Sequence, residues 1–232
     1  MKNYILKEYG SWSVMLISAL TGLFVSEGSY IKGISAILAL SLLTNSKQAI
    51  TIWKREEHQN KYIKAFIIQV LLGLSILAAL KGLSIIKLLP YASIPVLYIL
   101  LLFFAGEHKI YTEITGFATL TLSSLIAKFT STGIVDLTLY IGVAVFFIAG
   151  VFKVRVQLSK RLIWRILMML YITLSLFIYF LLETSSFVLL PLLDNVIFSI
   201  TMYRVKLKVT GWIEVSKGIA FLILMVFYYS AV

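Results

Sequence analysis

A carboxylate inside an apolar stretch is the residue of this sequence with the clearest capacity for chemistry. Asp194 lies nine positions from either end of the apolar block 185–203, roughly 13 Å deep at the rise of an α-helix. Charged groups at membrane depth face a helix bundle or a wet cavity and find a partner there. Such a group is either part of an ion, proton or substrate site or one half of a structural pair, and both interpretations stay open.

The preferred partner of Asp194 is Lys217, which lies six residues into the last expected helix and differs from it in depth by about 4 to 5 Å. Glu214 competes for the same ammonium group, because it lies three positions earlier on one helix. Asn195 adds a polar group beside the carboxylate. The sequence therefore predicts an intramembrane polar site formed by Asp194, Asn195, Glu214 and Lys217.

A second group of polar residues lies in or beside the basic segments that follow the apolar blocks 87–105 and 133–152. Basic pockets between membrane helices bind the phosphates of lipid head groups. We therefore predict a site for an anionic head group, with these members: His108, Lys109, Glu113, Lys153, Arg155, Lys160 and Arg161.

Several kinds of catalytic centre are excluded by composition. The chain has no cysteine and only two histidines, which removes thiolate chemistry and cysteine-based metal sites. Glu56, Glu57 and His58 are consecutive, so they are interpreted as a solvated loop that cannot converge on an ion without further ligands. No phosphate-binding loop, nucleophile elbow or zinc-protease motif occurs. We predict no catalytic residue, no metal and no intrinsic cofactor.

The elements that position these residues are apolar helices. Of 232 residues, 60% are hydrophobic and 13% charged, whereas soluble domains carry roughly 25% charged residues. The apolar residues form blocks of about the length that crosses a bilayer. The sequence predicts one all-α integral membrane domain over residues 1–232, a bundle of about nine transmembrane helices at 11–26, 29–44, 62–80, 87–105, 110–129, 133–152, 162–182, 185–203 and 212–230.

The positive charge predicts the orientation of these helices. Of the 21 Lys and Arg residues, only Lys32, Lys81, Lys87 and Lys128 lie outside the N-terminal segment and alternate loops. Cytoplasmic loops carry such an excess. We expect a multi-pass protein of the plasma membrane with its N-terminus in the cytoplasm and its C-terminus outside. The net charge of +11 then needs no nucleic acid to explain it.

Three short stretches resemble the YwiC-like membrane protein family. The run Lys7-Glu8-Tyr9-Gly10-Ser11-Trp12 resembles the family's opening, with Tyr9 in place of the usual histidine. Glu113 and Gly116 match its E-x-x-G arrangement, and Gly211 with Glu214 matches the start of its last helix. The hydropathy of that family is similar to that of UbiA-type prenyltransferases, which also have nine helices, so the resemblance implies a UbiA-like arrangement.

The resemblance to prenyltransferases does not extend to their metal sites. Those enzymes hold Mg²⁺ with Asp-rich motifs after helices 2 and 6. Here residues 45–49 contain no acid, and the loop after the sixth helix is purely basic. We therefore expect a non-catalytic accessory subunit of a respiratory-type membrane complex, with other membrane subunits and lipids as partners and a bound lipid or isoprenoid quinone. The alternatives are a divergent UbiA-like prenyltransferase, or a small transporter or proton conductor centred on Asp194.

Overall fold

The fold consists of helices throughout the described part of the chain. The structure is a computed structural model that describes all residues except 1–5, 7, 56–59, 204 and 232, so the predicted loop residues Glu56, Glu57 and His58 lie outside the described residues. Its elements are α1 (Tyr9–Phe24), α2 (Tyr30–Arg55), α3 (Asn60–Lys81), the 3₁₀-helix η1 (Gly82–Ala92), α4 (Ser93–Phe104), α5 (Ile110–Thr132), α6 (Leu137–Ser159), α7 (Leu162–Leu181), the 3₁₀-helix η2 (Ser186–Leu192), α8 (Leu193–Thr201) and α9 (Leu207–Ala231).

Prolines explain two departures from the predicted helices. The α-helix predicted over 87–105 begins only at Ser93, and the one predicted over 185–203 begins only at Leu193, each after a 3₁₀ segment that contains a proline. Proline has no N–H to donate and clashes with the preceding turn of an α-helix. Pro95, expected to bend a helix, lies in the first turn of α4, where its missing N–H leaves no bond unmade.

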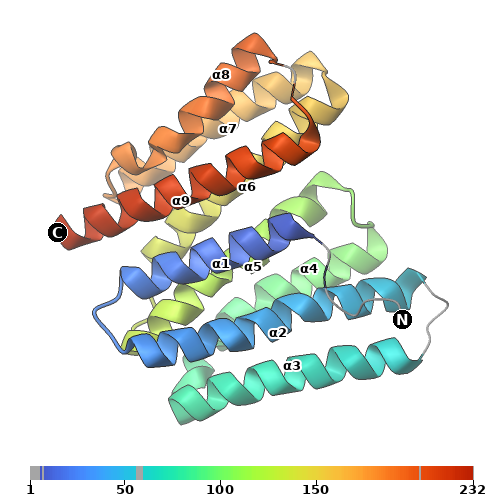
Figure 1. The fold of residues 1–232 in the computed structure, drawn as a ribbon, viewed down its shortest axis with the longest axis vertical. Coiled ribbons are helices and arrows are strands. Elements are labelled where there is room, and N and C mark those ends of the chain that lie inside the picture. Colours follow the sequence, from blue (N-terminus) through green and yellow to red (C-terminus); the bar gives the residue numbers. More distant parts are fainter. Residues whose placement is uncertain (1–5, 7, 56–59, 204, 232) are drawn as a thin grey trace.

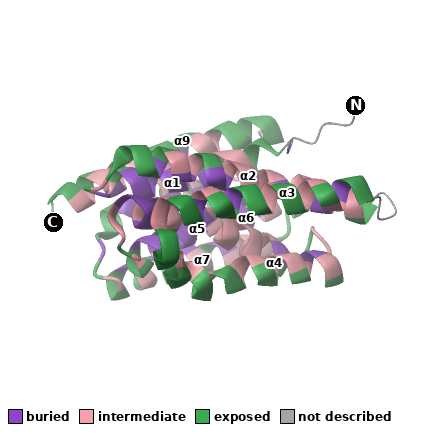
Figure 2. Cartoon of the chain, turned by 90° about the horizontal axis from the view of Figure 1, so that it is seen from below, coloured by how far each residue is buried: buried purple, intermediate pink, exposed green. Residues whose placement is uncertain are grey.

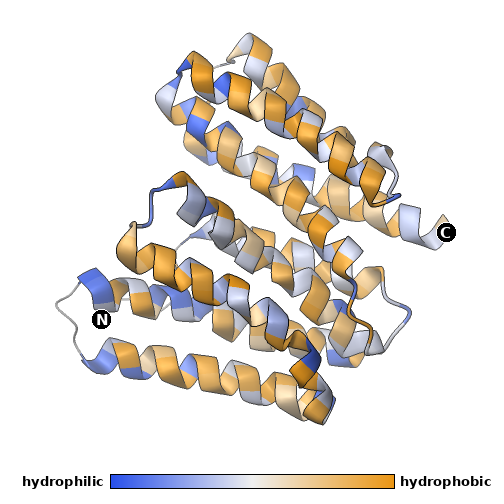
Figure 3. Ribbon diagram, turned by 180° about the vertical axis from the view of Figure 1, so that it is seen from behind, coloured by the Kyte–Doolittle hydropathy of each residue, from blue (hydrophilic) through white to orange (hydrophobic). Residues whose placement is uncertain are grey.

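The all-helical prediction is confirmed for the described residues, whereas the number of membrane crossings is not. Five helical stretches are long and apolar enough to cross a membrane: Asn60–Phe104, Ile110–Thr132, Leu137–Ser159, Leu162–Leu181 and Leu207–Ala231. Tyr9–Phe24 and Ser186–Thr201 are shorter apolar helices. Figure 3 shows the middle parts of the helices as mainly hydrophobic, whereas hydrophilic segments gather at the helix ends. The molecule is therefore a helical membrane protein.

The helices run side by side in two groups. Figure 1 shows α1 to α5 in one half and α6 to α9 in the other, with α6 packed on both α5 and α7. At one end of the bundle, Arg55, the last residue of α2, binds Glu107 after α4, and Gln157 of α6 donates to the carbonyl of Val205 before α9. At the other end, Lys128 of α5 binds Asp136 before α6. The segments predicted to be basic therefore share one end.

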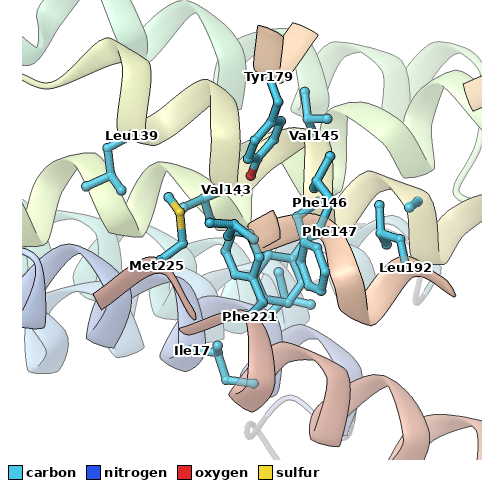
Figure 4. Packing of buried hydrophobic residues seen from close by; sticks show 14 residues of the cluster. Ile17, Leu139, Val143, Val145, Phe146, Phe147, Tyr179, Leu192, Phe221 and Met225 are labelled. Atoms are coloured by element: carbon cyan, nitrogen blue, oxygen red, sulfur yellow. The ribbon is translucent and has the colours of Figure 1, made fainter. Parts of the chain in front are cut away.

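The core lies where α1, α6, α7 and α9 meet. The helix α6 is the most buried of the five long apolar stretches, and Figure 2 shows the buried residues in the middle of the bundle beneath exposed outer faces. Phe146 of α6 stacks on Phe221 of α9 with ring centroids 4.0 Å apart (Figure 4). The hydroxyl of Tyr179 donates to the carbonyl of Gly142 at 2.9 Å, which satisfies a buried polar group.

The tightest helix contact in the first half lies between α1 and α5. A Cβ atom at Gly22 would overlap the backbone of Ser124, and the hydroxyl of Ser123 donates to the carbonyl of Met15 at 2.9 Å. Small residues allow two helix backbones to approach this closely. About two turns nearer the start of α5, Gly116 packs against the ring of Tyr98 of α4. The helix α5 is thereby fixed against both α1 and α4.

Candidate functional site

Four charged residues from three helices form one contiguous group in the second half of the molecule. Lys153 of α6 binds Asp194 of α8, and its ammonium lies 2.9 Å from the carboxylate of Glu214 on α9. Lys217, also on α9, lies 2.8 Å from Glu214 and 3.7 Å from Asp194. We call these four residues the charge cluster. Two ammonium groups and two carboxylates balance, so the cluster carries no net formal charge.

The polar neighbours of the charge cluster complete its hydrogen bonds. Asn195 is fully buried; its side-chain oxygen accepts from Lys217, and its amide donates to the carbonyl of Ala149 at 3.4 Å. The hydroxyl of Tyr203 donates to Asp194 at 2.9 Å. Lys153 is 0% exposed, whereas the two carboxylates are each somewhat over a quarter exposed. A buried charge persists only when it is paired and hydrogen-bonded in this way.

The structure corrects two details of the predicted polar site. It brings Asp194, Asn195, Glu214 and Lys217 together, but Lys153, predicted to contact a lipid head group, is the closer partner of Asp194. Asp194 also lies in the first turn of α8 rather than in the middle of a long helix. The reason is Pro191, which lies near the end of the 3₁₀ segment that precedes α8 and cannot continue an α-helix from it. Whether the cluster is functional or structural stays a prediction.

The predicted head-group residues are divided among three places. Glu113 and Arg155 form an ion pair at 2.7 Å, and the guanidinium of Arg155 also donates to the carbonyl of His108. Lys109 is the residue before α5, whereas Lys160 and Arg161 connect α6 to α7 and are exposed. Because Lys153 lies in the charge cluster, these residues do not converge as one basic pocket.

Sequence reasoning missed a cavity of about 640 Å³ between the helices of the first half and α6. Its apolar wall includes Leu40 of α2, Val70 of α3, Ile99 of α4 and Leu120 of α5. Charged and titratable residues gather toward one end, which we call the polar end: Glu8, Lys47, Glu107, His108 and Glu113. Ligand sites are commonly apolar hollows of this size with a few placed polar groups.

Lys47 is held between two carboxylates at the polar end. Its ammonium lies 2.6 Å from Glu8 and 3.8 Å from Glu107, and Glu107 is bound in turn by Arg55 at 2.7 Å. Burial alone would raise the pKa of Glu8, but the charge of Lys47 and its hydrogen bond outweigh burial and leave that pKa lowered. Lys47 was placed in a polar loop by the sequence, yet it lies on α2, which continues to Arg55.

The class of protein that the fold and the cavity define is a helical membrane protein with an internal apolar cavity. The sequence model of a family described as YwiC-like protein matches residues 5–131, more than half of the chain. The chain belongs to the YwiC-like family, which confirms the resemblance found in the sequence. Comparison with curated proteins and with solved structures gives no match.

The family match covers the cavity rather than the charge cluster. Residues 5–131 contain all the described cavity-lining residues except Gly150, Val151 and Val154 of α6. The four members of the charge cluster lie beyond residue 131. The cavity is therefore the feature that the matched segment builds, and it is the first candidate for a functional site.

Proposed function

We propose that this protein is a non-catalytic membrane protein that holds the chain of a lipid or an isoprenoid quinone in the cavity of its first half. The observation that supports the proposal is the cavity of about 640 Å³, apolar along its walls and charged at one end. An amphiphile has this same division between an apolar chain and a polar head. Because lipid tails are as apolar as the cavity wall, close packing rather than exclusion of water would hold the chain there.

The test is to identify the molecules that purify with the protein when its cavity is filled by a side chain. Thr119 lines the cavity, and its hydroxyl bonds only to the carbonyl of Thr115 one turn earlier, so Thr119→Trp occupies the space with little other loss. Thr173→Trp is the matched control, because Thr173 bonds its own helix in the same way on the exposed face of α7.

We expect native mass spectrometry to find a bound amphiphile on the wild-type protein and on Thr173→Trp, and to find it lost from Thr119→Trp. A protein that carries no bound amphiphile in a mild detergent, or that keeps it equally in all three forms, would contradict the proposal. Thermal unfolding of each variant checks that the loss is not caused by misfolding.

The proposal includes a role as an accessory subunit of a larger membrane assembly of the respiratory type. Long apolar faces on α3 and α7, with residues such as Leu71, Leu74, Leu170 and Phe177 exposed, are available to lipid or to partner helices. Purification in mild detergent after crosslinking in membranes is the test. We expect defined partner chains to be captured through α3 or α7, and a solitary monomer would refute this part.

The proposed topology has nine crossings in the plasma membrane, with the N-terminus in the cytoplasm. It is supported by the shared end of the basic segments. Because the chain has no cysteine, a cysteine at exposed Arg161 or Ile134 can be labelled without background. Ile134 is preferred to Gly133, whose positive φ disfavours a side chain. We expect an impermeant thiol reagent on intact cells to label position 134 and not position 161; the reverse pattern would invert the topology.

A small transporter or proton conductor centred on Asp194 is the second candidate, favoured by the charge cluster and by its partly exposed carboxylates. Ion or proton flux in liposomes that disappears in Asp194→Asn, while the variant still folds, would support it. A divergent UbiA-like prenyltransferase remains the third, and it requires Mg²⁺-dependent turnover of a prenyl diphosphate.

A further inference from the structure

One hydroxyl group in the wall of the cavity has no hydrogen-bond partner among the described residues. Thr112 lies in the first turn of α5, is 1% exposed, and lines the cavity close in sequence to His108 and Glu113 of the polar end. Other lining hydroxyls of the same helix are occupied: Thr119 donates to Thr115, and Ser123 donates to Met15. A buried hydroxyl without a partner costs free energy, and a ligand in the cavity that bonds to it would offset that cost.

The charged residues that line the cavity exclude a ligand with an anionic head group. The described lining residues include three carboxylates, from Glu8, Glu107 and Glu113, but one cationic side chain, Lys47, which already binds Glu8. Arg55 and Arg155 lie against Glu107 and Glu113 rather than in the lining. Each carboxylate is thus already paired with a cation, so a phosphate in the cavity would find no free cation among the described lining residues, and burying an unpaired charge is costly.

The unpartnered hydroxyl and the lack of a free cation among the described lining residues together select an uncharged head group. We propose that the cavity binds an amphiphile whose head is neutral and bears an oxygen that hydrogen-bonds to the hydroxyl of Thr112. The apolar chain then lies along the face of α5 formed by Gly116, Thr119 and Ser123, which follow Thr112 at helical spacing and line the same cavity. This inference rests on the proposed function and names the ligand class of that site.

The test compares two ligands that share a chain and differ in the head. Geranylgeraniol carries a hydroxyl and geranylgeranyl phosphate an anion, and each is titrated onto the purified full-length protein in lipid nanodiscs. We expect the alcohol to bind about tenfold more tightly or better, because the phosphate must be buried without a free cation to pair with. Geranylgeranyl phosphate that binds as tightly as the alcohol, or more tightly, overturns the inference while leaving the proposed cavity function intact.

Variants of Thr112 test the hydrogen bond itself. Thr112→Val keeps the shape and removes the hydroxyl, and we expect about a fivefold loss of affinity for the alcohol, the size of one ordinary hydrogen bond. Thr112→Ser keeps the hydroxyl and should bind like wild type. The matched control is Thr51→Val, because the hydroxyl of Thr51 is also buried and unpartnered among the described residues but does not line the cavity.

The remaining outcomes are also decisive. Equal affinity of Thr112→Val and Thr51→Val for the alcohol would overturn the assignment of Thr112. Binding of neither ligand, together with no amphiphile on the purified wild-type protein, would overturn this inference and the proposed function together.

Discussion

The two halves of this molecule place a lysine between two carboxylates, and they do so in different surroundings. In the second half, Lys153 lies between Asp194 and Glu214, is 0% exposed, and shares those carboxylates with a second lysine. In the first half, Lys47 lies between Glu8 and Glu107, is 19% exposed, and borders a cavity of about 640 Å³. None of the four members of the charge cluster is among the described residues that line this cavity.

The difference shows that a buried ion pair does not by itself mark a binding site. In the charge cluster the two ammonium groups are enclosed by protein, and Gly150 leaves room for Glu214, whose carboxylate lies 3.3 Å from where a Cβ of residue 150 would be. The ion pairs of Lys47, in contrast, border the cavity, which protein atoms do not fill. We therefore interpret the charge cluster as a fastener of α6, α8 and α9, and the polar end as the wall of a site.

Removing the buried lysine is expected to have the largest effect. Lys153→Met leaves two carboxylates with one ammonium in a buried setting, and breaking a buried ion pair costs about 3–5 kcal/mol. Unfolding by SDS in mixed micelles measures the change. The control is Lys160→Met in the exposed α6–α7 connection, which should change stability little.

A second change should recover part of the loss if the cluster is structural. Combining Lys153→Met with Asp194→Asn restores charge balance, so the double variant should be more stable than Lys153→Met alone. A Lys153→Met protein as stable as the wild type would show that the cluster does not fasten these helices.

The corresponding substitution in the first half is expected to have a smaller effect. Lys47→Met removes an ion pair that is partly exposed, and such pairs contribute about 1 kcal/mol or less. High salt should reduce the difference from wild type, because exposed pairs are screened. The measurement is the same SDS unfolding, with and without added salt. An effect as large as that of Lys153→Met would remove the distinction between the two lysines.

The sequence predicted features that depend on one stretch of the chain, and it missed features that depend on how distant stretches pack together. The apolar blocks located most helices, because length and hydropathy are local properties. Lys153 was predicted to lie in a basic loop, because the helix expected over 133–152 ended just before it. In the structure α6 continues to Ser159, and Val154, Val156 and Leu158 continue its apolar pattern. The prediction that Asp194 finds partners followed from depth, but the identity of its nearest partner depended on how α6 packs against α8.

The cavity had no local signal at all. Its described lining comes from six α-helices and the 3₁₀-helix η1, and a hollow between helices depends on how their side chains fit together rather than on any single segment. Gly116 was recognised only as part of the E-x-x-G arrangement that resembles the family. That the hydroxyl of Thr112 lacks a partner is visible only when the surrounding helices are in place.

The smallest expected effect is a pH dependence at the polar end. The pKa of Glu8 is lowered from 4.5: burial acts to raise it, but the positive charge of Lys47 and its hydrogen bond prevail. A carboxyl whose folded pKa is depressed contributes stability above its unfolded pKa, and that contribution disappears as the pH falls through the folded pKa. Wild type should therefore be more stable than Glu8→Gln near neutral pH, and the difference should shrink once the pH falls below about 4.5. Melting temperatures between pH 7 and pH 3 measure this, with Glu27→Gln at the exposed far end of α1 as the control. A difference between wild type and Glu8→Gln that stays constant down to pH 3 would mean that the ion pair with Lys47 does not stabilise the polar end.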